Sequence, residues 1–489
     1  MIRTPLRPLA RILRARERGE NPDEIEAENR RHRHEAIQDK ARRRAEGRLI
    51  VMAGCFVLAF GTVGIRMGAL ANSQPTEPQA EVMSAQILSQ RADITDRHGR
   101  VLATNLLTHS LYAHPHQMVD PVRAAKGLAR IFPDLDEERL TRDFTGSRKF
   151  MWIKRKLSPE QMQAVHDIGE PGLLFGPREM RIYPNGHVAS HILGGSGFGH
   201  EGVNSAEVLG VAGVEKAFDG WLRDPSNGGA PLQLSIDLTV QSAMEEVLHS
   251  GMKLMNAKGA AAILMEVETG EILAMVSLPD FDPNDRPRPL LKGDPSDSPL
   301  FNRAVQGQYE LGSTFKIFPV AQALDLKLIN PASGINTRTP MQIGKYRIND
   351  FHNYGAQLSA TDVIVKSSNV GTVRIAQMLG VERQKNFLQR LGLFEPTPIE
   401  MVEAPTGKPL VPSRWPAVTS ATVSFGHGLA ASPLHLASAY ATIANGGVRV
   451  TPTLIHGRRA APGERVLSEG AAELAIGMLR QVVTRGTAK

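Results

Sequence analysis

The stretch Tyr-Glu-Leu-Gly-Ser-Thr-Phe-Lys at residues 309–316 decides the fold, because it sets a serine and a lysine three residues apart where an apolar run begins. The run predicts a helix with Ser313 at its N-terminus, where a backbone N–H is free to bind an oxyanion. Lys316 would lie on the same helix face. Burial would lower the pKa of Lys316 and let it take the proton of Ser313.

A second polar motif, Ser-Ser-Asn at residues 367–369, follows 54 residues later and holds the only Ser-x-Asn in the sequence. In isolation, each motif is better explained as a helix cap or a polar loop. Together and in this order they predict one acyl-transfer site. In it, Ser313 is the nucleophile and Lys316 the general base, while Ser367 and Asn369 supply a proton relay and a substrate clamp.

A further Ser-x-x-Lys pattern occurs at Ser250 and Lys253, and only its context separates it from the first. It lies near the C-terminal end of an amphipathic helix predicted over Thr239–Leu254. The helix dipole disfavours an anion at that end, so no acyl-transfer site is expected there.

Length and composition indicate a globular protein of two or three domains, with 489 residues of which 42% are hydrophobic and 22% charged. The net charge of +7 is concentrated in residues 1–48, which hold 14 Lys or Arg against 9 Asp or Glu. No zinc-finger spacing or aromatic-rich basic motif accompanies this charge, so no nucleic-acid partner is expected. The single cysteine, Cys55, excludes an intrachain disulfide and a cysteine-based metal site. Nothing suggests a metal or an organic cofactor.

An uncharged run at residues 49–65 predicts a membrane helix. It would span about 26 Å, and extension to Ala71 includes Arg66, which can reach the far interface. The alternatives are a buried helix and a signal peptide cleaved after Ala69-Leu70-Ala71. The apolar run and the 48-residue tail before it are both too long for a signal peptide. An uncleaved transmembrane signal anchor at 49–71 is therefore expected.

The charges beside this run predict its orientation. Arg42, Arg43, Arg44 and Arg48 directly precede it, and positively charged flanks stay in the cytoplasm. We therefore expect residues 1–48 to form a basic, partly helical cytoplasmic tail and everything after the anchor to lie outside.

After a polar linker at 72–79, alternating strand-like and helical runs predict α+β structure in two domains, 80–225 and 232–489. In the first domain, residues 94–103 predict strand, turn and strand. Residues 194–202 are rich in glycine and are expected to form a loop.

Two further local signals are specific. Ser158 precedes a proline and is expected to cap the helix that follows. Residues 260–277 predict a β-hairpin around a Glu-Thr-Gly-Glu turn, and the sequence after residue 299 is predicted to be mostly helical.

These motifs resemble those of the class B penicillin-binding proteins, the serine D,D-transpeptidases of bacterial cell-wall synthesis. The resemblance covers nearly all of the chain. The matching segments are 94–103 and 213–219 in the first domain and 302–304, 309–316, 366–371 and 425–428 in the second. One short anchor, a compact first domain and no glycosyltransferase module are most similar to the division-specific (FtsI) type.

The resemblance implies an elongated pedestal, or dimerisation-type, domain followed by a serine penicillin-binding/β-lactamase-like transpeptidase domain, an antiparallel sheet flanked by helices. It implies that Ser313 attacks the carbonyl between the two terminal D-alanines of a peptidoglycan stem peptide while Lys316 accepts its proton. Ser367 would return a proton to the departing D-alanine, and Asn369 would orient Lys316 and the substrate amide. An amine of a neighbouring stem would then resolve the acyl-enzyme and form the cross-link.

The partners implied by the resemblance are a stem peptide ending in D-Ala-D-Ala, the β-lactams that mimic it and acylate Ser313, the membrane, and division proteins including a lipid-linked glycan polymerase. The implied location is the bacterial inner membrane at the septum. The chain would cross it once, with its N-terminus cytoplasmic and its bulk periplasmic.

One family element has no match, because no lysine is followed by Ser-Gly or Thr-Gly. Thr406-Gly407-Lys408 has the reverse order, and residues 485–489 resemble the loop that leads towards the Lys-Thr-Gly strand. We therefore expect the sequence to be truncated before that strand, which binds the substrate carboxylate and supplies an oxyanion donor worth about 10²–10³ in rate. This polypeptide is expected to be poorly active, and its 260–277 hairpin to expose an apolar edge.

Two other classes of protein fit the serine and lysine. A penicillin sensor or structural division protein would be acylated without turnover, but a sensor usually needs a cytoplasmic signalling module, for which the charged tail is too short. A β-lactamase or carboxypeptidase is disfavoured by the pedestal and the uncleaved anchor.

Overall fold

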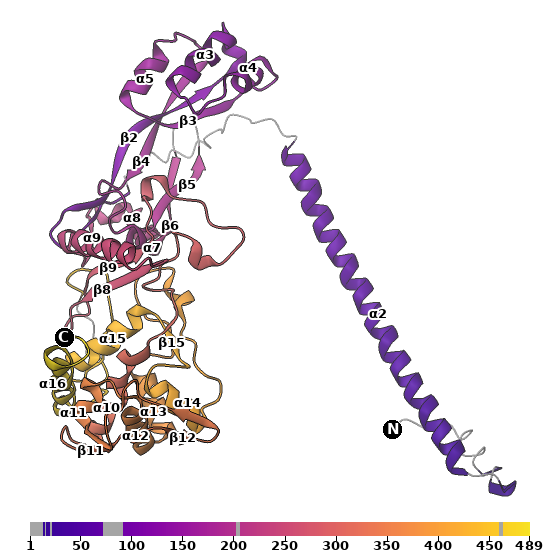
Figure 1. Cartoon of the computed structure of the whole chain (residues 1–489). Helices are drawn as coiled ribbons and strands as arrows, with labels where there is room; N and C mark the ends of the chain where they lie inside the picture. Colours follow the sequence, from indigo (N-terminus) through magenta and orange to yellow (C-terminus); the bar gives the residue numbers. More distant parts are fainter. Residues whose placement is uncertain (1–12, 15, 20–21, 72–90, 202–205, 459–462) are drawn as a thin grey trace. The chain divides into compact units, whose positions relative to one another are not determined.

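The computed structural model describes residues 13–14, 16–19, 22–71, 91–201, 206–458 and 463–489, and its contacts divide the chain into two units, Met1–Thr76 and Glu77–Lys489 (Figure 1). The predicted linker at 72–79 lies outside the described residues.

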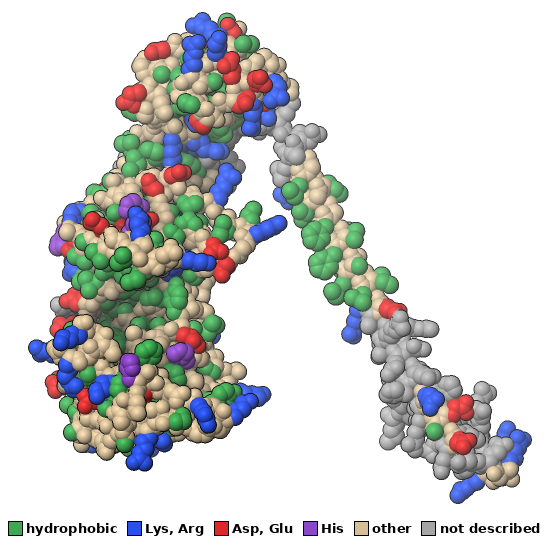
Figure 2. Space-filling view, in the orientation of Figure 1, with side chains coloured by type: hydrophobic (Ala, Val, Ile, Leu, Met, Phe, Trp, Pro, Cys, Tyr) green, Lys and Arg blue, Asp and Glu red, His purple; other side chains and the backbone are tan. Residues whose placement is uncertain are grey.

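In the first unit, α2 (Pro22–Ala71) is one continuous helix. Its segment Glu46–Gly68 is long and apolar enough to cross a membrane, and none of it is buried. Figure 2 shows hydrophobic side chains along this part of α2. The apolar segment begins and ends slightly before the span predicted at 49–71.

A five-stranded sheet forms the first part of the second unit. Its long strand β2 (Val101–Ala113) pairs antiparallel with β1 (Ile94–Thr95), β3 (Met151–Leu157) and β4 (Leu173–Ile182). β7 (Leu232–Gln233) joins parallel to β1. The predicted strand, turn and strand at the start of this region are therefore confirmed.

Three helices pack at one end of this sheet, as Figure 1 shows: α3 (Pro121–Ile131), α4 (Glu137–Thr145) and α5 (Pro159–His166). Their apolar faces share one core with β2, β3 and β4. Ser158 caps α5 as predicted. Its Oγ accepts the N–H of Gln161, and the Gln161 side chain accepts the N–H of Ser158 in return.

The expectation of a loop at residues 194–202 is wrong. β5 (Gly195–Glu201) pairs antiparallel with β6 (Ala206–Ala212). Glycine ordinarily weakens a strand, but it also permits close approach of a second backbone. Gly194, directly before β5, shows such an approach, since a Cβ on it would lie 2.1 Å from the backbone of Ala212 at the end of β6.

A buried carboxylate joins distant segments of this region. Glu215, on α7 (Gly213–Ala217), has no exposed surface and accepts hydrogen bonds from Arg91 Nε at 2.7 Å and Arg181 Nε at 2.6 Å. The Arg91 guanidinium also bonds to Asp219, on α8 (Asp219–Leu222), at 2.8 Å. One acidic side chain thus ties the start of the region to β4 and to the α7–α8 segment.

The next part of the unit begins with α9 (Leu238–Leu254), which packs against the antiparallel hairpin of β8 (Ala260–Met265) and β9 (Ile272–Leu278). The predicted helix and hairpin are therefore confirmed. In the part of the chain that the structure describes, β8 pairs with β9 alone. Leu264 on β8 is 42% exposed, as expected for an open apolar edge.

The remaining elements are short strands and a group of helices around the largest apolar core, which includes Phe315, Phe318 and Val423. They are β10 (Tyr309–Glu310), α10 (Ile317–Asp325), β11 (Gly334–Asn336), β12 (Met341–Ile343), β13 (Tyr346–Ile348), β14 (Gln357–Ser359), α11 (Ala360–Val365), α12 (Asn369–Leu379), α13 (Val381–Arg390), α14 (Ala417–Ser424), β15 (Ala430–Ala431), α15 (Pro433–Ala444) and α16 (Glu469–Arg485). The short helix α6 (Ser190–Leu193) belongs instead to a second core, which it shares with Leu102 and Val214.

Replacing the buried carboxylate tests how much it stabilises the fold. Glu215→Gln is expected to lower the free energy of unfolding by about 3–5 kcal/mol, because two buried guanidinium groups would then face a neutral amide. Asp134→Asn is the control, since Asp134 pairs with Lys154 while itself 67% exposed, and a much smaller loss is expected. Urea unfolding followed by circular dichroism measures both. Equal losses would contradict the role given to Glu215.

Candidate active site

Ser313 and Lys316 share a short 3₁₀ helix, η5 (Gly312–Lys316), which continues directly into α10. Side chains three residues apart eclipse one another in a 3₁₀ helix, so the two side chains occupy one face. Ser313 is exposed, whereas Lys316 is only 3% exposed. The predicted position of Ser313 at the start of a helix is confirmed.

Lys316 reaches across to the second motif. Its Nζ donates to Ser367 Oγ at 2.8 Å and to the Ser367 carbonyl oxygen at 2.5 Å. Burial lowers the pKa of Lys316 to about 8, although the nearby negative charge of Asp350 acts in the opposite direction. Ser367 has a φ of 56°, in the left-handed region that costs a non-glycine residue energy. Such strain at a residue that binds the buried lysine is typical of a functional site.

The neighbouring Ser368 holds the second motif in place. Its Oγ accepts the N–H of Gly371 at 2.9 Å, which caps α12, and donates to Asp350 Oδ2 at 2.7 Å. Asp350 Oδ1 accepts the N–H of Val370 at 2.9 Å. Sequence reasoning missed Asp350, because no spacing or periodicity connects it to the Ser-Ser-Asn motif 17 residues later.

Asn369 lies at the start of α12, and its Nδ2 donates to the Asn349 carbonyl oxygen at 3.1 Å. The structure thus brings Ser313, Lys316 and Ser367 around one space, while the side-chain hydrogen bond of Asn369 joins it to Asn349. Its proposed role in orienting Lys316 and the substrate stays a prediction.

A cavity of about 240 Å³ opens between these residues. Ser313, Lys316 and Ser367 line it together with apolar side chains of α10, α11 and α16, such as Ile317 and Leu479. Polar and apolar side chains both line the cavity, so it could hold a small molecule that carries polar groups.

Tyr440, on α15, also lines this cavity and was not predicted from the sequence. Its hydroxyl donates to the Thr314 carbonyl oxygen at 2.6 Å, and its ring packs edge-on against Phe318 at 5.6 Å between centroids. Burial raises the pKa of Tyr440 to about 12, so the hydroxyl keeps its proton and remains a donor. Tyr440 therefore holds the turn that carries Ser313 against the core.

A glycine-containing loop at residues 425–428 also contacts the turn that carries Ser313. The N–H of Gly312 donates to the Gly426 carbonyl oxygen at 3.1 Å, and a Cβ on Gly426 would lie 2.1 Å from the Gly312 carbonyl oxygen. Nearby, the N–H of Gly428 donates to the Glu310 carboxylate at 2.7 Å. The Phe-Gly-His-Gly segment at 425–428 thus holds the turn that carries Ser313.

The other Ser-x-x-Lys pair lies apart from this arrangement. Ser250 and Lys253 are both exposed in the last turns of α9. Among the described residues, one group of three His, Cys, Asp or Glu side chains has the spacing of metal ligands, namely His187, Glu245 and Asp280, and it contains none of the residues above.

Two family models match successive parts of the chain. The Penicillin-binding Protein dimerisation domain matches residues 86–230, and the Penicillin binding protein transpeptidase domain matches residues 260–489. The two matches correspond to the sheet-based first part of the second unit and to the part that carries Ser313.

Individual proteins agree with these matches. The chain is 34% identical over 446 residues to the probable peptidoglycan D,D-transpeptidase FtsI of Caulobacter vibrioides, which covers 90% of this chain and 72% of the relative. It is 28% identical over 475 residues to the peptidoglycan D,D-transpeptidase FtsI of Escherichia coli K12, covering 90% and 78%. A solved complex of penicillin-binding protein PBP2 with MreC from Helicobacter pylori has the same fold, with a TM-score of 0.66 at 20% identity over 81% of this chain and 83% of that one.

Two alanine substitutions separate backbone strain from the close contact behind Ser313. Gly426 and Gly428 both have a φ of 84°, so alanine at either costs about 1–2 kcal/mol. Only Gly426→Ala adds a clash with Gly312, since the nearest atom to a Cβ on Gly428 is 3.6 Å away. We expect Gly426→Ala to destabilise the protein by about 4 kcal/mol in urea unfolding. A Gly428→Ala loss as large would contradict the proposed contact.

Proposed function

Since the chain belongs to the class B penicillin-binding proteins of the FtsI type, which are serine D-Ala-D-Ala transpeptidases of peptidoglycan, we propose that Ser313 is the nucleophile that the stem peptide acylates. The observation that carries the proposal is the bond from Lys316 Nζ to Ser367 Oγ at 2.8 Å, beside the cavity that Ser313 also lines. The lowered pKa of Lys316 lets it act as a base, and the Ser367 hydroxyl can carry a proton. Both support the role of Ser313 as nucleophile.

In the first step, Ser313 Oγ bonds to the carbonyl carbon between the two terminal D-alanines, and its proton passes to neutral Lys316. With a pKa of about 8, about a tenth of Lys316 is neutral at pH 7, against fewer than about one in a thousand for an exposed lysine. The helix that η5 and α10 form would favour the developing oxyanion beside Ser313 through its dipole.

In the second step, the C–N bond breaks and the departing D-alanine amine takes a proton from Lys316 through Ser367 Oγ. The product is an ester of Ser313. An amine from a neighbouring stem then attacks this ester, forms the new amide and returns the proton to Ser313 through Lys316. Asn369 would hold the substrate amide during both steps. A β-lactam would form the same ester by opening its ring.

A second candidate function is acylation without cross-linking, as in a penicillin sensor or a structural division protein. Such a protein would use the same serine and lysine, Ser313 and Lys316, to form the ester. The two candidates differ in whether the acyl-enzyme is passed to an amine.

The location and partners follow from the same proposal. The segment Glu46–Gly68 would cross the inner membrane, with the tail that precedes Arg48 in the cytoplasm and the acyl-transfer site in the periplasm. A periplasmic site at the septum would meet nascent peptidoglycan, so a lipid-linked glycan polymerase is the expected partner among division proteins.

Labelling with a fluorescent penicillin tests the nucleophile. The full chain is expected to carry the label on Ser313, located by mass spectrometry, and Ser313→Ala to lose it. The chain supplies a matched control in Ser250→Ala, which changes the other Ser-x-x-Lys pair and should label like the unmodified protein. Retained labelling of Ser313→Ala would refute the assignment. Release of the acyl group to an added D-amino acid separates a transpeptidase from a protein that is only acylated.

The pH dependence of labelling tests the base. The acylation rate is expected to rise about tenfold per pH unit below pH 8 and to level off above it, because only neutral Lys316 accepts the proton. Lys316→Arg stays charged and should lose both the rate and this rise, whereas Lys253→Arg should keep the profile. A profile that stays flat between pH 6 and pH 8 in the unmodified protein would exclude Lys316 as the base.

A further inference from the structure

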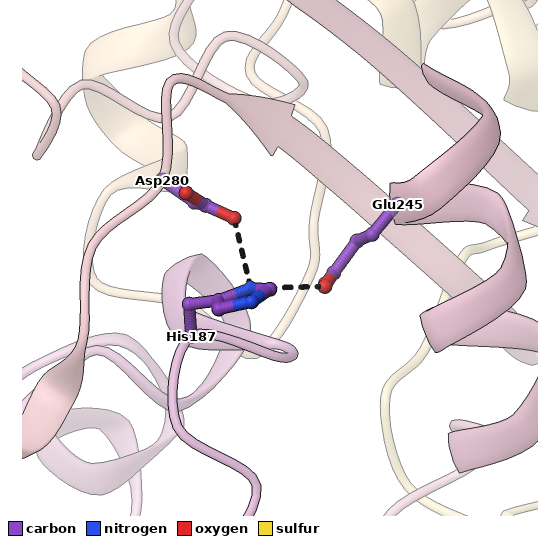
Figure 3. A group of neighbouring side chains, drawn as sticks. All are labelled: His187, Glu245 and Asp280. Carbon is purple, nitrogen blue, oxygen red and sulfur yellow. Dashed lines mark ion pairs between the residues drawn. The ribbon is translucent and has the colours of Figure 1, made fainter. Parts of the chain in front are cut away.

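Three potential metal ligands converge at a place remote in sequence from the nucleophile (Figure 3). His187 lies in the turn between β4 and α6, Glu245 on α9, and Asp280 just after β9. His187 Nδ1 is 3.2 Å from Asp280 Oδ2 and 3.7 Å from Glu245 Oε2, and all three ligand atoms lie within 4.8 Å of one another. Figure 3 shows the imidazole between the two carboxylates.

Glu245 points an unsatisfied oxygen into this group. Its side chain is 8% exposed, and Oε1 accepts from the Ala189 N–H at 2.9 Å and from Gln241 Nε2 at 2.7 Å. Oε2 is buried and makes no hydrogen bond within the described residues. A buried carboxylate oxygen without a partner is costly, and a cation in front of it would remove that cost.

The hydrogen bonds are also incomplete without a cation. The imidazole can donate one proton from Nδ1 to one carboxylate, which leaves the second without a donor at this point. A divalent cation could contact all three ligand atoms at once.

The spacing suits a small cation. Zinc bonds to histidine nitrogen and carboxylate oxygen at about 2.0–2.2 Å, so ligand atoms at adjacent corners of a tetrahedron are about 3.4 Å apart. The two distances from Nδ1, 3.2 and 3.7 Å, lie on either side of that value. The His187 side chain is 63% exposed, which leaves a solvent-facing fourth position for water. One imidazole and two carboxylates suit Zn²⁺ better than Ca²⁺, which takes six to eight oxygen ligands.

We propose that His187, Glu245 and Asp280 form a Zn²⁺ site with water as the fourth ligand. His187 belongs to the part matched by the dimerisation-domain model, Asp280 to the part matched by the transpeptidase model, and Glu245 to the helix between them. The metal therefore clamps the pedestal turn to the transpeptidase part. Since neither Ser313 nor Lys316 takes part in it, the site acts on domain coupling and not on the chemistry.

The test is zinc binding by the full chain in detergent after removal of metals with a chelator. Isothermal calorimetry with ZnCl₂ is expected to show one equivalent bound, and elemental analysis to recover one zinc per chain after dialysis. Zinc should also raise the thermal unfolding temperature, because a ligand that binds only the folded state stabilises it. Chain that binds no zinc, or that takes up Ca²⁺ in preference, would overturn the proposal.

Matched histidine variants locate the site. His187→Ala should abolish both the equivalent of zinc and the rise in unfolding temperature. His98→Ala is the control, since His98 is similarly exposed at 58% and lies 3.2 Å from one carboxylate, that of Asp237, without forming a three-ligand group. It should bind zinc like the unmodified chain. Asp280→Asn keeps the shape of the side chain and should weaken binding at least tenfold. Unchanged affinity in His187→Ala or in Asp280→Asn would refute the site.

Discussion

The buried ammonium group of Lys316 is the constraint on which the proposed acyl-transfer site depends. A lysine that is 3% exposed loses most of its hydration and must find polar partners inside the fold. Ser367 supplies two, its hydroxyl and its carbonyl oxygen, from a segment 51 residues away. Its strained backbone persists only because the surroundings hold it. The same burial that makes the contact necessary lowers the pKa of Lys316 into the range of a useful base.

Two groups of hydrogen bonds hold the segments on either side of the Lys316–Ser367 contact in place. On one side, Ser368 and Asp350 fix the start of α12, and with it Ser367. On the other side, Tyr440 and Gly426 form hydrogen bonds with the turn that carries Ser313. Each support is a short, directional contact, and the apolar core beneath cannot deform continuously. Ser313 and Lys316, set on rigid elements in this way, would need little rearrangement before the proposed reaction.

In the pedestal, a buried negative charge needs polar partners in the same way as the buried positive charge of Lys316. Glu215 is buried and is acceptable there because Arg91 and Arg181 both bond to its carboxylate. Glu245, on α9 after the pedestal, is also buried, but only one of its oxygens has hydrogen-bond partners. The contrast between a satisfied and a half-satisfied carboxylate is what distinguishes a structural network from a candidate cation site.

The sequence by itself determined what depends on neighbouring residues. The Ser158 cap, the hairpin at 260–277 and the helix that starts at Ser313 were predictable, because capping, turn chemistry and periodicity act over a few residues. The two polar motifs predicted three of the residues that line the cavity, namely Ser313, Lys316 and Ser367. The order of the motifs along the chain indicated the family.

Only the tertiary structure decided which remote groups complete the site. Asp350, Tyr440 and the contact between Gly312 and Gly426 carry no local signal, and the glycines of β5 gave the opposite signal to the strand that they form. The same holds for the free oxygen of Glu245. Each depends on how closely segments far apart in the chain approach one another, and that distance is set by packing of the whole core and not by any single stretch of sequence.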